Sequence, residues 1–108
     1  MINLFRSVLR TPAPELPGPG LRFRAAPDVK ASLHSDGVVL IHTGKGTVFS
    51  ANRVGAMIWD GATRQWTIEK VVRSISDAFE IPAQTVRQDA AMFLAQLEAE
   101  GLLISDAG

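Results

Sequence analysis

The chain has 108 residues, of which 46% are hydrophobic and 20% are charged, and its 11 basic residues balance its 11 acidic ones. This length allows one domain with a modest core, and the lack of cysteine excludes disulfides, thiol chemistry and cysteine-ligated zinc. A net charge of zero gives no overall attraction to nucleic acid or to an anionic membrane, and no apolar run approaches the roughly 18 residues of a membrane span. The composition is compatible with the reducing cytosol, and we expect a cytoplasmic protein with no membrane partner.

The first 20 residues are expected to be a flexible tail and linker, followed by one domain over residues 21–108. Residues 11–20 hold four prolines and two glycines, a composition typical of linkers. The segment before them places four apolar side chains on one helical face: Ile2, Phe5, Val8 and Leu9. A frayed amphipathic tail, a docking helix for a partner enzyme and a membrane contact all remain open for this segment.

Three short strands are predicted in succession. Apolar and polar residues alternate weakly over residues 30–34, and residues 38–42 are β-branched and aliphatic. Residues 47–51 are the third predicted strand. The turn at 35–37 ends in Asp-Gly, a pair favoured where a tight hairpin needs a positive φ, and residues 43–46 form a second glycine-containing turn. Two short connections between three strands predict an antiparallel meander.

The first helix is expected to begin after Asn52, whose side chain can accept a hydrogen bond from an otherwise unpaired amide. Gly55 is costly inside a helix, so we expect close packing against a neighbouring element there. Asp60 and Gly61 are expected to end or weaken this helix. Trp66 follows, either in the core or on a surface patch.

Two further helices follow. Thr67 is expected to cap the second helix, whose core stripe has strong helical spacing: Ile68, Val71, Val72, Ile75, Ala78 and Phe79. The third helix runs from about Ala83 to Glu100, with Pro82 suited to its first turn and Gly101 as its stop. Its core stripe has the same spacing: Val86, Ala90, Phe93, Leu94 and Leu97.

The opposite face of the third helix carries small or uncharged side chains where charges would be expected: Gln88, Ala91, Met92, Ala95 and Ala99. One interpretation of this face is structural, because alanine promotes helix formation. Small residues also let another backbone approach, and methionine adapts to varied apolar shapes. A contact face for a peptide or for a second copy of the chain is the functional interpretation.

The sequence offers no catalytic constellation, metal site or cofactor site. His34 and His42 lie on adjacent predicted strands but lack further ligands, and no serine or threonine has a histidine base oriented by a carboxylate. The glycine-containing turn at 43–46 resembles a phosphate loop only superficially, because it leads into a strand. We therefore expect a binding module rather than an enzyme.

A small sheet with three helices also describes a winged helix-turn-helix domain. Residues 67–108, however, hold three basic and seven acidic residues, which is unfavourable for approaching a polyanion. No nucleic-acid partner is expected. A winged-helix DNA-binding regulator and a homodimeric structural adaptor remain the alternatives.

The order of several short motifs resembles the PqqD-like family of peptide chaperones, also called precursor-peptide recognition elements of RiPP biosynthesis (ribosomally synthesised and modified peptides). The resemblance covers roughly residues 22–104. It rests on a strand at 36–40, then N-x-V-G-x-x-I-W from Asn52, T-I-E from Thr67, V-x-x-D-x-x-x-F-L-x-x-L from Val86 and G-L-L from Gly101. No single motif is diagnostic, but the ordered combination is fairly specific.

The resemblance implies an α+β fold, with a three-stranded antiparallel sheet followed by three helices as in a winged helix-turn-helix, that does not bind DNA. It implies that the leader segment of a precursor peptide adds as an extra strand, and that the domain presents it to a modifying enzyme such as a radical SAM protein, a protease or a cyclase. The strand that would receive the leader is Thr47, Val48, Phe49, Ser50 and Ala51. The leader would lie in a groove between this strand and the third helix. We assign the helix side of the groove to Arg87, Gln88, Ala91, Met92 and Ala95. The alternative is that Val86, Ala90 and Phe93 are shared between the core and the groove.

Overall fold

The computed structural model describes residues 21–107, in which four strands precede three helices and a fifth strand follows them. In chain order the elements are β1 (Leu21–Ala25), β2 (Val29–His34), β3 (Gly37–His42), β4 (Thr47–Asn52), α1 (Arg53–Thr63), α2 (Ile68–Phe79), α3 (Ala83–Ala99) and β5 (Leu103–Ala107). The expected tail over residues 1–20 lies outside the described residues.

Strands β2, β3 and β4 form an antiparallel sheet in that order, which confirms the predicted meander. In the β3–β4 pair, Leu40 lies opposite Phe49 and Ile41 opposite Val48. Because side chains alternate between the two faces of a sheet, the first pair faces the helices and the second faces away. The α+β class and the order of one sheet followed by three helices are confirmed.

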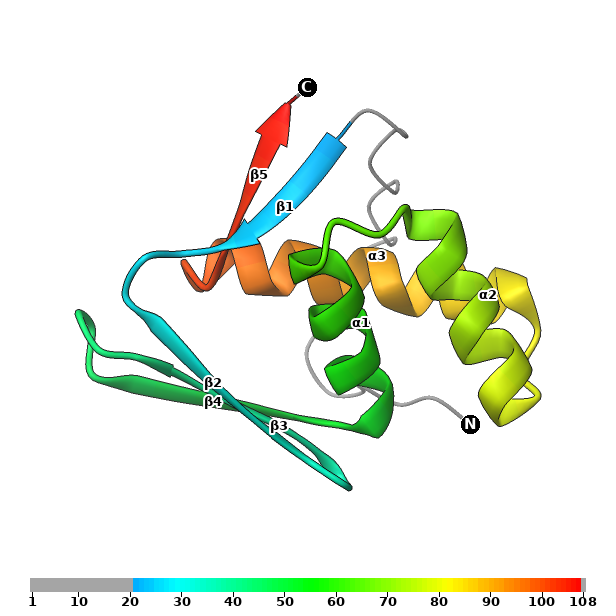
Figure 1. Cartoon of the computed structure of the whole chain (residues 1–108), viewed down its shortest axis with the longest axis horizontal. Coiled ribbons are helices and arrows are strands. Elements are labelled where there is room, and N and C mark those ends of the chain that lie inside the picture. Colours follow the sequence, from blue (N-terminus) through cyan, green and yellow to red (C-terminus); the bar gives the residue numbers. More distant parts are fainter. Residues whose placement is uncertain (1–20, 108) are drawn as a thin grey trace.

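A second, two-stranded sheet joins the two ends of the described chain and is absent from the sequence-based prediction. β1 and β5 pair antiparallel, with Phe23 opposite Ser105. Figure 1 shows this pair on one side of the helices and the three-stranded sheet on the other. The Phe23 side chain is buried, so the pair closes the core on that side.

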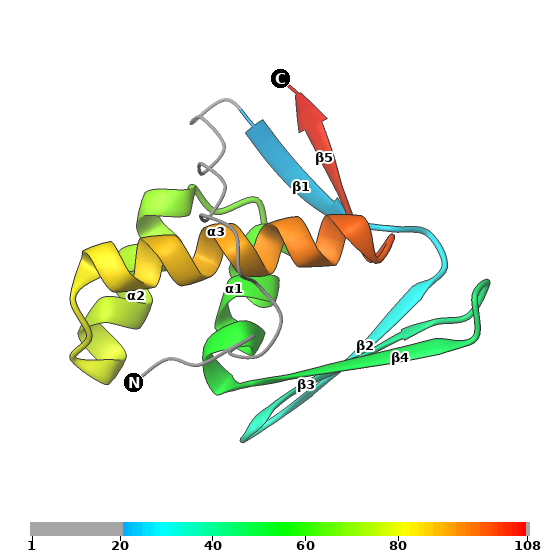
Figure 2. The ribbon, with the colours of Figure 1, turned by 180° about the vertical axis from the view of Figure 1, so that it is seen from behind.

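Helix α1 lies in the middle of the molecule. It packs on β1, β3, β4, α2 and α3, and Figure 2 shows α3 crossing it on the face opposite to that seen in Figure 1. The largest fully buried side chains come from the three-stranded sheet, from all three helices and from the connection between α3 and β5: Phe93, Leu40, Ile58, Ile75, Leu97 and Leu102. One continuous core therefore fixes the position of the sheet relative to α3.

The predicted helix boundaries are largely confirmed. The Asn52 carboxamide oxygen accepts a 3.0 Å hydrogen bond from the Gly55 amide, and the Thr67 hydroxyl accepts a 3.1 Å bond from the Lys70 amide. Gly101 has a φ of +75°, which favours glycine after a helix. Pro82 is the N-cap of α3 and so precedes the first turn of the helix, in which it was expected.

Helix α1 does not end at Asp60–Gly61, contrary to the prediction, and runs on to Thr63. A Cβ on Gly61 would lie 2.6 Å from Cγ2 of Val71, so glycine here permits α1 to pack closely on α2. A second expectation was also wrong, because Ala78 is exposed although it continues the helical spacing of the core stripe.

Gly37 is required for a reason other than the predicted positive φ. Among the described residues, positive φ values occur at Gln65, Glu80, Gly46 and Gly101 only. A Cβ on Gly37 would instead clash with the carbonyl oxygen of Ala51 on the neighbouring strand. The glycine thus allows β3 and β4 to approach where β4 leads into α1.

Candidate binding edge

Strand β4 lies at an edge of its sheet. β3 pairs with one side of it, and no described strand pairs with the other. Val48 and Ser50 point away from the helices and are exposed, with 68% of Val48 accessible, whereas Phe49 and Ala51 are half-buried against the core. The predicted residues Thr47 to Ala51 therefore lie together along one edge, whose amide and carbonyl groups can pair with an added strand.

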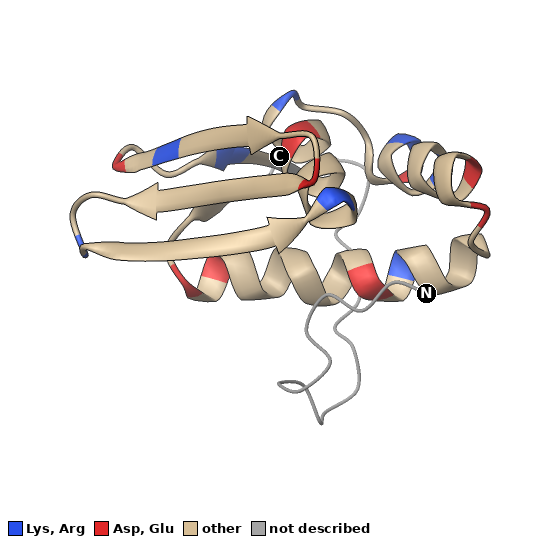
Figure 3. Cartoon of the chain, turned by 90° about the horizontal axis from the view of Figure 1, so that it is seen from below, with Lys and Arg blue, Asp and Glu red and all other residues tan. Residues whose placement is uncertain are grey.

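Helix α3 lies beside this edge strand. Figure 3 looks onto the outer face of the sheet and shows β4 as its strand nearest α3. The ring of Phe49 lies 6.2 Å from that of the fully buried Phe93, measured between centroids. A Cβ on Gly55 would lie 2.6 Å from Cβ of Ala51 and 3.1 Å from Cζ of Phe93. The expected close packing at Gly55 is thus confirmed, and it is what lets α1, β4 and α3 meet.

The α3 residues predicted to bind the peptide are distributed over different sides of the helix. Phe93 marks the side of α3 that faces β4, and successive helical residues turn by about 100°. Met92 therefore adjoins that side and is half-buried, while Ala91 and Ala95 lie far around the helix. Ala91 is buried with 5% exposure and Gln88 is exposed. The role of these residues in peptide binding stays a prediction.

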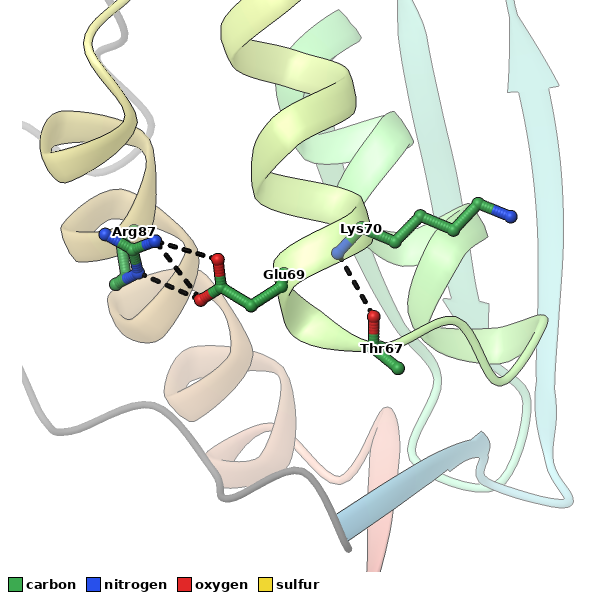
Figure 4. A network of polar contacts seen from close by, with 4 residues as sticks. All are labelled: Thr67, Glu69, Lys70 and Arg87. Atoms are coloured by element: carbon green, nitrogen blue, oxygen red, sulfur yellow. Dashed lines mark hydrogen bonds and ion pairs between the residues drawn. The ribbon is translucent and has the colours of Figure 1, made fainter.

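Arg87 points toward α2. Its guanidinium forms a forked ion pair with the Glu69 carboxylate, with a shortest distance of 2.9 Å. Figure 4 shows this pair bridging α3 and α2, next to the Thr67 cap of α2. The ion pair holds the two helices together at their surfaces, and a role of Arg87 in peptide binding also stays a prediction.

Sequence reasoning gave no role to Asp89, although it falls on the aspartate of the V-x-x-D motif. Asp89 lies one turn before Phe93 on the same side of α3. Its Oδ2 atom is buried and accepts no hydrogen bond from any described residue. Burial raises the pKa of the Asp89 carboxyl above its ordinary value.

The Asp89→Asn variant is expected to melt at a higher temperature than the wild type at pH 7. Because the pKa is raised on folding, the charged carboxylate destabilises the folded state above that pKa. The penalty is lost as the pH falls through the raised pKa toward the ordinary value of 3.8, so the advantage of the variant should shrink there. Thermal melts at several pH values, with Asp77→Asn at an exposed site as control, test this; an unchanged difference between pH 7 and pH 4 would contradict it.

The two histidines lie at opposite ends of the β2–β3 pair, because His34 is opposite Gly37 and His42 is opposite Val29. The His34 ring is 2.9 Å from the Ser32 hydroxyl, and Nδ1 of the buried His42 accepts the Lys45 amide hydrogen. Within residues 21–107, no three histidine, cysteine or carboxylate side chains gather as metal ligands would. No helix in the same part of the chain is long and apolar enough to cross a membrane.

A small cavity of about 70 Å³ lies between α1 and α2, away from the β4 edge. Its lining includes Met57, Trp66 and Val71. Trp66 is half-buried and packs against the core, as expected if it is a core residue rather than part of a surface patch. The Lys70 ammonium lies 4.2 Å from the centroid of the Trp66 ring. The cavity is too small for a peptide and shares no lining residue with β4.

Comparison with known proteins agrees with this arrangement. The family model described as "Coenzyme PQQ synthesis protein D (PqqD)" matches residues 37–103, which span β3 to the start of β5. No curated protein matches the chain at a significant level. Two solved structures do, and both are described as complexes with a leader peptide.

The first structure is TbiB1 in complex with the TbiA(β) leader peptide. It is 30% identical to this chain, with a TM-score of 0.68, over 74% of this chain and 93% of TbiB1. The second is a lasso peptide synthetase B1 complexed with its leader peptide, with 19% identity and a TM-score of 0.71 over 77% of this chain and 98% of the other. Because its sequence identity is so low, the second structure supports the fold only. The family model covers more than half of the chain and the first structure is matched over nearly its whole length, so the chain belongs to the PqqD family.

Proposed function

We propose that this protein binds the leader segment of a ribosomally synthesised precursor peptide and presents it to a modifying enzyme. The observation that carries the proposal is the edge of β4, which is unpaired among the described strands and lies next to α3. An extended peptide that joins such an edge gains main-chain hydrogen bonds whatever its sequence. The leader complex of the 30% identical TbiB1 supports the same choice of ligand.

Specificity would come from alternate side chains of the leader. Those that face the helices would lie beside Phe49 and Ala51 on one side and the Met92–Phe93 side of α3 on the other. Those that face outward would continue the surface of Val48 and Ser50. The protein would then act without catalysis, in the cytoplasm where precursor peptides are made, and a radical SAM protein, a protease or a cyclase would act on the bound peptide.

DNA binding is a weaker candidate. Arg87, the one basic residue of α3, is engaged by Glu69, and Glu98 and Glu100 are exposed at the end of that helix. A helix that reads DNA needs cations directed toward phosphates. Homodimerisation is compatible with leader binding and belongs to the same proposal.

A titration followed by NMR tests the proposed function. The ¹⁵N-labelled protein is mixed with the TbiA(β) leader peptide and with leader segments of short precursor peptides from the same genome as this chain. Binding should shift amide signals of β4 and of the neighbouring part of α3, with an affinity in the micromolar range or tighter, because ordering a flexible leader costs free energy. Absence of shifts with every leader, or shifts confined to the α1–α2 cavity, would contradict the proposal.

A further inference from the structure

A lysine joins the beginning of β4 to the end of α3. Lys45 lies in the turn just before β4, and its Nζ donates a 3.2 Å hydrogen bond to the carbonyl oxygen of Glu100, the C-cap residue of α3. A Cβ on Gly101 would lie 2.8 Å from this Nζ, so the glycine leaves room for the ammonium group. A cation is favoured at the C-terminus of a helix. A positive charge therefore lies where the beginning of β4 meets the end of α3.

An arginine marks the other end. Arg53 follows β4 directly as the first residue of α1, and its guanidinium carbon lies 5.3 Å from the ring centroid of Phe79. Phe79 is the last residue of α2, shortly before α3 begins at Ala83. The Arg53 side chain thus extends from the end of β4 toward the start of α3, as Lys45 does from the beginning of β4 toward the end of α3.

Both cations are exposed, and neither forms an ion pair with a carboxylate among residues 21–107. At the lysine end, Glu100 offers Lys45 its backbone carbonyl, while the Glu100 carboxylate accepts a 3.1 Å hydrogen bond from Gln96. The Asp28 carboxylate also lies near this turn, because a Cβ on Gly44 would be 3.0 Å from its Oδ2. β4 itself, with the sequence TVFSAN, has no charge. The edge is therefore an uncharged strand with, beyond each end, a cation that forms no ion pair within residues 21–107.

We propose that the leader recognised here carries a carboxylate on each side of an uncharged extended stretch of about six residues. This inference rests on the proposed function. The six residues of β4 span roughly 17–20 Å, and an added strand of equal length would place its flanking residues beside Lys45 and Arg53. Because a cation lies at both ends, the requirement is the same for a parallel and an antiparallel leader. The two charges thus select peptides by charge, whereas the backbone of β4 does not.

The test measures binding of a fluorescein-labelled leader by fluorescence polarisation at several salt concentrations. The probe is the TbiA(β) leader peptide, or the tightest leader from the titration above. Lys45→Met and Arg53→Met should each weaken binding roughly 2- to 5-fold, and the double variant about tenfold, since exposed charge pairs contribute modestly. The double variant should also lose most of the salt dependence that the wild type shows.

Arg73→Met is a matched control, because it removes an exposed cation of α2, outside the sheet, and should leave binding unchanged. A leader in which every Asp and Glu is replaced by Asn or Gln should bind the wild type about tenfold more weakly and should not distinguish the wild type from the double variant. The inference is overturned if that neutral leader binds as tightly as the acidic one, or if the double variant keeps the affinity and salt dependence of the wild type. If the wild type binds no leader at all, the proposed function itself fails.

Discussion

Proline near the start of β4 is expected to separate leader binding from folding. The N–H groups of a strand at the edge of a sheet point alternately toward the neighbouring strand and toward the free edge. Of the adjacent amides of Thr47 and Val48, one therefore pairs with β3 and the other is available to a leader. Both side chains are exposed, so neither substitution removes a core contact. We expect one of the two variants, Thr47→Pro or Val48→Pro, to fold normally and to lose leader binding.

The size of this loss follows from the missing donor. A carbonyl of the leader left without its partner costs about 1–3 kcal/mol, which is a roughly 5- to 150-fold weaker affinity. The other proline removes a bond to β3 and should lower the melting temperature instead. Calorimetry and thermal melts measure the two effects, and Val48→Ala, which keeps the amide, should bind within about threefold of the wild type. Two proline variants that both bind the leader normally would exclude pairing at this end of β4.

The order of strands and helices could be predicted because it is encoded locally. The Asn52 and Thr67 caps, the stripe of Val71, Val72 and Ile75, and the Gly101 stop each depend on residues within a few positions of one another. The β1–β5 pair could not be predicted in this way, since it joins segments about 80 residues apart in sequence and each strand has only five residues.

The candidate edge was predictable for a similar reason, and its surroundings were not. In a meander of three strands the last strand lies at an edge, so residues 47–51 follow from the turns alone. Which side of α3 faces that edge depends on the packing of Phe93 on Phe49, a contact between residues far apart in sequence. A helical wheel separates the buried side of a helix from its exposed side. It does not say which of the residues between these two sides lie next to β4. The predicted α3 residues, Arg87, Gln88, Ala91, Met92 and Ala95, were therefore chosen without knowing the position of β4, and among them Met92 is nearest to Phe93 around the helix.

Gly61 is a second feature that local sequence rules could not explain. From its neighbours alone, Asp60–Gly61 is expected to end the helix, because glycine is costly in a helix interior. In the structure the lost helix propensity is offset by the close approach of Val71 from α2. Gly55 serves a similar purpose toward Ala51 and Phe93. Both glycines of α1 thus mark contacts between elements, which become visible only when the neighbouring element is placed.

Phe93→Ala is expected to have the largest effect on stability of the substitutions considered. The side chain is fully buried and contacts the ring of Phe49, so its removal leaves a cavity where α1, β4 and α3 meet. Truncation of a buried phenylalanine to alanine lowers the free energy of unfolding by about 3–5 kcal/mol. For a domain of this size the melting temperature should fall by roughly 12 °C or more. Urea denaturation measures the loss, and Phe93→Leu, which keeps most of the apolar volume, should lose clearly less.

Coupling to Gly55 shows whether the loss arises at the contact seen in the structure. Gly55→Ala alone should destabilise the protein by about 1–3 kcal/mol, because the new Cβ would crowd Ala51 and Phe93. Without the Phe93 ring part of this crowding is relieved, so the double variant should be more stable than the sum of the single losses predicts, by about 0.5 kcal/mol or more. Strictly additive losses would mean that Gly55 and Phe93 do not contact each other in solution. The close packing of α1 on α3 at Gly55 would then have to be explained in another way.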